Sequence, residues 1–209
     1  MQDVLELDAE PHDPAGPVVC FDEASKELRR DVAEPIPPAP GPPAKRDDES
    51  TRHATANLFV IVEPLAGRRH ITVTDRRTIA DFAGQMKYLC DEMYPEATTI
   101  RVVLDGLNRH AYGSLFATDA PEEAWRLARR PEFHFTPKHA RWLTMAECEL
   151  SVLSRRCLDR RLSSKEAVTA EVGPWEEERN RAGVRLVWSF RVADARRKLA
   201  HLYPQNSQR

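Results

Sequence analysis

The first half of the chain places three runs of β-forming residues before any helical pattern, which constrains the order of its strands and helices. The three runs lie at 17–21, 57–63 and 70–74. A loop that contains glycine separates the last two, which is typical of a β-hairpin. From Thr78, which we expect to cap a helix, the apolar residues instead recur with helical spacing over 79–93. The chain therefore starts with an antiparallel unit and continues with a helix.

The second half alternates strands with helices. We expect a strand at 100–105, a helix at 121–130, a strand at 132–136, and helices at 145–158, from 163 and at 193–202. Residues 184–190 look extended, and Gly173-Pro174 is expected to interrupt or split the helix from 163, since proline lacks a backbone donor. This order predicts an α/β fold: a mixed five-stranded sheet with helices on both faces, which is the element order of the ribonuclease H-like fold.

The composition is that of a globular protein, with 41% hydrophobic and 31% charged residues among 209. No apolar run is long enough to cross a membrane and no secretory signal is visible at the N-terminus, so a cytoplasmic protein is expected. The four cysteines lack C-x-x-C spacing, which predicts free thiols rather than disulfides or a zinc site. The four tryptophans, at 125, 142, 175 and 188, are interpreted as core residues.

Charge and proline divide the chain unevenly. Residues 1–50 hold 13 acidic and 5 basic residues, whereas the remaining residues hold 20 and 26. Six of the nine residues at 35–43 are prolines, which favours an extended loop. We expect an N-terminal extension at 1–15 and one domain at 16–209, with an acidic, proline-rich loop at 31–50 and helical additions from about 163. The basic body is compatible with a polyanionic partner.

Three carboxylates stand where the predicted strands end or the next helix begins. Asp22 ends the first strand, Asp105 ends the fourth, and Glu147 opens the helix after the fifth. The first and fourth strands are neighbours in the predicted sheet, so these side chains are expected to converge. Carboxylate oxygens at an open site suit Mg²⁺ or Mn²⁺, and two such ions can cut or join a phosphodiester. The alternative is that these acids only cap strand ends and helix starts.

Three sequence blocks, at 18–23, 102–110 and 134–147, together resemble the DDE transposases of bacterial insertion sequences related to mariner elements. The segment 190–204 is also similar. The resemblance implies a ribonuclease H-like catalytic domain that binds two divalent ions and cuts and joins DNA at the ends of the element. It also implies that Asp22, Asp105 and Glu147 are the catalytic, metal-binding triad.

The resemblance suggests roles for further residues around the triad. DNA phosphates are expected to contact Lys138, His139 and Arg141, and the triad is expected to be supported by Asn108, His110 and Thr144. Thr144 also stands where a side chain can cap the helix that carries Glu147. The expected partners are the DNA of transposon ends and target and a second copy of the chain in a homodimer, with no membrane.

Some positions depart from the family pattern. Gly106 and Thr144 replace asparagines, and Arg141 replaces a small residue. Gly106 lacks a side-chain amide that could orient a ligand. Family members also begin with helix-turn-helix modules, for which residues 1–15 give no room, so that module is expected to be lost or separately encoded. The alternative function is therefore a catalytically impaired, truncated remnant that only binds DNA or oligomerises.

Overall fold

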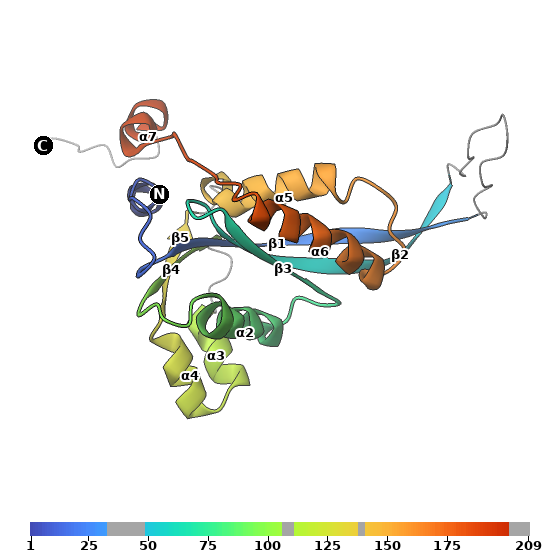
Figure 1. The fold of residues 1–209 in the computed structure, drawn as a ribbon, viewed down its shortest axis with the longest axis horizontal. Helices are drawn as coiled ribbons and strands as arrows, with labels where there is room; N and C mark the ends of the chain where they lie inside the picture. The colour runs from blue at the N-terminus through green and yellow to red at the C-terminus, as the bar shows by residue number, and fades with distance from the viewer. Residues whose placement is uncertain (33–48, 106–110, 138–140, 201–209) are drawn as a thin grey trace, which may run out of the picture.

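The sheet is mixed and has five strands in the order β3-β2-β1-β4-β5 (Figure 1). The computed structural model describes residues 1–32, 49–105, 111–137 and 141–200. The strands are β1 (Val18–Asp31), β2 (Ser50–Glu63), β3 (Arg68–Thr74), β4 (Ile100–Asp105) and β5 (Pro131–Thr136). The first three pair antiparallel, and β4 runs parallel to both β1 and β5. The predicted sheet and hairpin are confirmed.

Strands β1 and β2 are far longer than predicted, with 14 residues each. Their outer halves form a two-stranded ribbon that runs beyond the rest of the sheet in Figure 1, paired as far as Asp31 and Ser50. The register shifts between Leu28 and Arg29, where β2 contributes one extra residue, His53. Most ribbon side chains are polar and exposed. The apolar runs in the sequence therefore predicted only the inner halves of these two strands. Most of the proline-rich loop predicted at 31–50 lies outside the described residues.

One face of the sheet is covered by α2 (Ile79–Tyr88), α3 (Ala111–Thr118) and α4 (Pro121–Ala128). Thr78 caps α2 as predicted, in a reciprocal capping box with Asp81. A π-helical turn, Leu89–Met93, extends α2. Helix α3 was not predicted, and it packs on α2. The core on this face is formed by side chains of the sheet and α2, among them Phe21, Phe59, Phe82 and Leu104.

The opposite face is covered by α5 (Met145–Arg156) and α6 (Lys165–Arg181), with α1 (Gln2–Leu7) and α7 (Val192–Lys198) near the sheet end (Figure 1). Residues 1–15 were expected only as an extension, yet Val4 and Leu5 of α1 are fully buried. The expected break at Gly173-Pro174 was wrong, because α6 is continuous with Pro174 inside it. Core contacts by Val172 before the proline and bonds to β3 by Glu176 after it hold both halves of α6 against the sheet.

Side chains of α6 form hydrogen bonds with the backbone of the edge strand β3. The Asn180 side chain accepts a bond from the Arg69 backbone N–H at 2.8 Å and donates one to the Arg69 carbonyl at 2.9 Å, as a neighbouring strand would. Glu176 accepts a bond from the Ile71 N–H at 2.8 Å. Gly67, in the β2–β3 turn, has φ +69°, and a Cβ there would lie 2.7 Å from the backbone of Gly183 after α6. The C-terminal half of α6 is thus fitted closely to this edge.

The segment 184–190 forms no strand, although the Leu186 N–H donates to the Pro64 carbonyl at 2.9 Å. The interpretation of the tryptophans as core residues was wrong for two of them: the exposed fraction is 59% for Trp125 and 41% for Trp142.

All four cysteines are free, as predicted. Among the described residues, no helix is both long and apolar enough to span a membrane.

Candidate active site

Asp22 and Asp105 lie at the same level on neighbouring parallel strands. The paired register of β1 and β4 runs to Cys20 opposite Val103, and each aspartate stands two residues further along its strand. Because side chains alternate between faces, Asp22 lies on the face of Cys20 and Asp105 on the face of Val103, which is the α5 face. Both carboxylates are buried, with 4% and 7% exposure. The predicted neighbourhood of the first and fourth strands is therefore confirmed.

The start of α5 sits directly over β1. The buried Cys20 side chain packs in one apolar cluster with Met145 and Ala146 at the start of α5, and Thr144 lies beside it. Burial, together with the nearby Asp8 carboxylate, raises the pKa of this thiol to about 12, so the thiol stays protonated and packs as an apolar residue. The N-terminus of α5 is thereby fixed two residues from Asp22 on the same face of β1.

Glu147 is in the first turn of α5 and is partly exposed. Thr144 takes the N-cap position in an extended conformation, but its side chain makes no capping hydrogen bond, so the predicted cap is only positional. Its hydroxyl instead lies beside Cys20, and the residue is completely buried. The Thr144 hydroxyl has no hydrogen-bond partner in the described part of the chain.

Thr136 lies beside Asp105 and was not singled out from the sequence. The register of β4 and β5 pairs the two residues directly, on the same face of the sheet. Thr136 is 2% exposed, and its hydroxyl oxygen has no hydrogen-bond partner in the described part of the chain. A buried hydroxyl without a partner is uncommon. The ends of β4 and β5 and the adjacent part of β1 thus carry two carboxylates and one hydroxyl at the same level. The prediction that Asp22 ends the first strand was wrong, because β1 continues to Asp31.

Among the described residues, Asp22, Asp105 and Glu147 do not form a three-ligand metal site. Within residues 1–32, 49–105, 111–137 and 141–200, no group of three His, Cys, Asp or Glu side chains is arranged to hold one ion. The two aspartates are placed by the sheet, whereas Glu147 approaches from the first turn of α5. Carboxylates alone form a hard oxygen donor set, which suits Mg²⁺ or Mn²⁺ and does not suit zinc in a structural site.

Several predicted residues cannot be placed. Asn108, His110 and Gly106 precede α3 and lie outside the described residues, as do Lys138 and His139 before α5. Arg141 begins a 3₁₀ turn, Arg141–Leu143, of which only the backbone of this residue is described. The predicted DNA contacts and most of the predicted supporting residues therefore stay predictions.

A buried ionic cluster anchors α5 and was missed in the sequence. The Glu149 side chain is fully buried, and its Oε1 lies 2.8 Å from Nε of Arg69 on β3 and 2.8 Å from Nε of Arg179 on α6. Burial lowers the pKa of the Arg69 guanidinium, and Glu149 beside it counteracts that shift. Glu149 stands three residues after Ala146 and four before Leu153, inside the apolar stripe of α5, and that position was a usable signal.

Comparisons with known proteins place the fold. A model of the family described as DDE superfamily endonuclease matches residues 17–169. The crystal structure of the Mos1 strand transfer complex is similar, with TM-score 0.52 and 15% identity over 81% of this chain and 51% of that chain. A pre-cleavage Mos1 transpososome has TM-score 0.51 and 14% identity over 81% and 55%.

At these identities the similarity to Mos1 concerns the fold alone, and it confirms the predicted ribonuclease H-like architecture. The chain spans about half the length of the Mos1 chains that it matches. No curated protein matches it in sequence.

Proposed function

Because the chain belongs to the DDE superfamily of endonucleases, a family of enzymes, we propose that it is the catalytic domain of an insertion-sequence transposase that cuts and joins DNA phosphodiesters. One observation carries the proposal: the parallel register of β1 and β4 sets Asp22 and Asp105 at the same level, on the face where α5 begins. In open α/β sheets, ligands bind at the carboxyl ends of parallel strands, and here that end is the end of β4, at Asp105 beside Asp22.

Asp22, Asp105 and Glu147 are proposed to hold Mg²⁺ or Mn²⁺, as two ions. When bound, such ions supply an activated water or 3′-hydroxyl and stabilise the leaving oxygen of the phosphodiester. The two aspartates contribute ligands from rigid, buried strands, which fixes their positions before DNA arrives. Glu147, partly exposed in the first turn of α5, is proposed to contribute the third carboxylate.

DNA is the proposed partner, as transposon end and as target. Lys138, His139 and Arg141, between β5 and α5, are proposed to contact its phosphates. Asn108, His110 and Thr144 are proposed to orient the carboxylates. We further propose a homodimer in the bacterial cytoplasm.

A metal titration of the purified chain tests the carboxylate site. Millimolar Mn²⁺ or Mg²⁺ is expected to raise the melting temperature, because a ligand that binds only the folded state stabilises it, by about 2.7 kcal/mol at 100 times its Kd. Asp22→Asn should abolish the rise. Glu122→Gln, on the exposed surface of α4, should keep it. Equal shifts in both variants, or none in the wild type, would contradict the metal site.

The second candidate is the impaired remnant, and one observation favours it: Thr144, which stands where the family has an asparagine, makes no capping hydrogen bond to α5. If the departures at 106 and 144 impair catalysis, Gly106→Asn with Thr144→Asn should raise metal-dependent nicking by about 10- to 100-fold, the usual effect of residues that orient metal ligands. Gly106→Asn alone serves as a second variant, because Thr144 is completely buried. Unchanged nicking in both variants would argue against impairment by these residues.

A further inference from the structure

Thr136 ends β5 with a buried hydroxyl that the fold itself does not use. The residue is 2% exposed, and its Oγ1 has no hydrogen-bond partner in the described part of the chain. Burying a hydroxyl without a partner costs stability. Valine has nearly the same shape and is also favoured in strands, so packing and strand formation alone give no reason for the hydroxyl.

The local sequence fixes the position of this side chain. Pro137 follows Thr136, and a residue before proline is held in an extended conformation. Two residues earlier on β5, His134 is paired with Val103, which packs in the cluster at the start of α5. Because side chains alternate along a strand, Thr136 lies on the same α5 face, directly paired with Asp105.

The Thr136 hydroxyl is within reach of the Asp105 carboxylate. Neighbouring strands lie about 4.8 Å apart, so two side chains that are paired directly and share a face are in contact range. A rotation of the two side chains is enough to bring the hydroxyl oxygen to hydrogen-bonding distance of a carboxylate oxygen. The backbone of β4 and β5 needs no change for such a bond to form.

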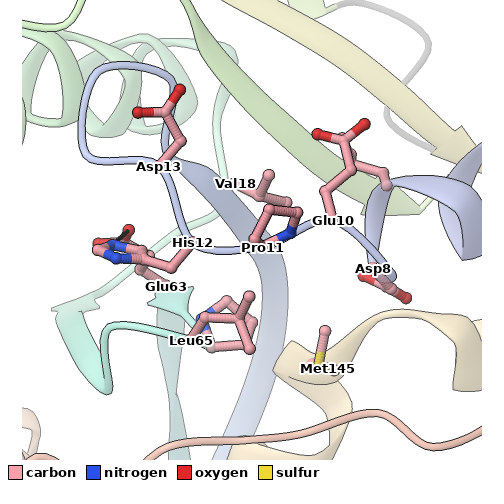
Figure 2. A pocket seen from close by; sticks show the side chains of 11 residues that line it. Asp8, Glu10, Pro11, His12, Asp13, Val18, Glu63, Leu65 and Met145 are labelled. Carbon is pink, nitrogen blue, oxygen red and sulfur yellow. Dashed lines mark hydrogen bonds and ion pairs between the residues drawn. The ribbon is translucent and has the colours of Figure 1, made fainter.

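Other buried polar atoms without a hydrogen bond already face an opposite charge. Nε of Arg69 lies 2.8 Å from Oε1 of Glu149. Asp8 borders a small hollow after α1 (Figure 2), and the positive charge of Arg191 lies near it. For the Thr136 hydroxyl, the charged group that the strand register places beside it is the candidate metal ligand Asp105.

Carboxylates that bind metal ions are themselves held by hydrogen bonds, and losing such a bond weakens metal binding. The Thr136 hydroxyl is a donor without a partner at the place where such a bond is needed. We propose that Thr136 is a positioning residue, whose hydroxyl donates to the Asp105 carboxylate when the site holds metal. This inference rests on the proposed metal site of Asp22, Asp105 and Glu147.

Calorimetric titration of the full chain with Mn²⁺, without DNA, tests this role. Thr136→Val removes the hydroxyl and keeps the shape of the side chain, and it should raise the Kd for Mn²⁺ by about 10- to 100-fold. Thr136→Ser keeps a hydroxyl donor and should stay close to the wild-type Kd. Thr72→Val lies on the opposite edge strand, about 19 Å away across four strand spacings, and should leave the Kd unchanged.

The melting temperature without added metal separates positioning from a structural role. The Thr72 hydroxyl donates to Oε1 of Gln85 at 2.9 Å, so Thr72→Val should lower the melting temperature. Thr136→Val should instead keep or raise it, because the hydroxyl that it removes is buried without a partner. A variant that is at least as stable as the wild type but binds metal more weakly is the expected signature.

A wild-type Kd for Mn²⁺ in Thr136→Val would overturn the proposal. So would a Kd in Thr136→Ser as high as in Thr136→Val, or a loss of melting temperature in Thr136→Val as large as in Thr72→Val. If the wild type binds Mn²⁺ and Asp22→Asn does not, the metal site stands even where the role of Thr136 fails. A wild type that binds no Mn²⁺ would refute the metal site and this role together.

Discussion

Asp105→Asn is expected to abolish metal-dependent nicking of DNA while the chain stays folded and keeps its affinity for DNA. The substitution preserves the shape of the side chain at the end of β4 but removes a charged oxygen ligand. Metal ions contribute several kcal/mol of transition-state stabilisation in phosphoryl transfer, and each 1.36 kcal/mol is tenfold in rate. A loss on the order of 10³-fold follows, measured as the rate of nicking of supercoiled DNA in Mn²⁺.

The control for this experiment is Glu132→Gln on the neighbouring strand β5, where the carboxylate is exposed. It should nick at the wild-type rate. Asp22→Asn with Asp105→Asn should be no slower than either single variant, because residues that act on one metal centre are not additive. Nicking at an unchanged rate in Asp105→Asn would refute the proposal that Asp105 is a catalytic metal ligand. An inactive wild type that still binds DNA would favour the remnant.

Glu149→Leu is expected to destabilise the fold by about 3–5 kcal/mol, the usual effect of removing one partner from a buried ion pair. The Arg69 side chain has no exposed surface, so its charge would stay in the core with its nearest anion gone. Asn180 would still bond the Arg69 backbone and guanidinium, but an amide carries no compensating charge. Urea unfolding followed by circular dichroism measures the loss.

The double variant Arg69→Met with Glu149→Leu separates the ion pair from simple packing. Replacing both partners with apolar residues is often neutral or stabilising, so it should recover most of the lost stability. Glu123→Gln is the matched control, because its partners Lys87 and Arg126 lie at the surface, and its unfolding midpoint should change little. A double variant as unstable as Glu149→Leu would show that the cluster contributes by shape and not by charge.

The strands at the centre of the sheet were predictable because their apolar runs are short, dense and end in polar residues. The inner parts of β1, β2 and β4 are nearly all buried, which is the pattern that such runs report. The ribbon halves could not be predicted, because their residues are polar and owe their strand conformation to pairing with each other. Helix α6 shows the same limit: contacts with β3 hold it together across Pro174.

The sequence predicted which strands carry the two aspartates but not what surrounds them. The positions of Asp22 and Asp105 at the ends of apolar runs correctly predicted that the two residues lie on neighbouring strands. Thr136 gave no comparable signal, because a threonine near the end of a strand is common and its buried, unpartnered hydroxyl emerges only from the fold. The seat of α5 on Cys20 depends in the same way on a contact between residues more than a hundred positions apart.

Strand β1 joins the candidate site mechanically to the far end of the ribbon. The nine steps from Asp22 to Asp31 span roughly 30 Å at about 3.3 Å per residue. A paired strand resists stretching, whereas it bends where an extra residue interrupts the pairing, here between Leu28 and Arg29. The ribbon is therefore expected to bend mainly at this register shift. A partner that binds the end of the ribbon would change the angle of its outer part and leave Asp22 in place.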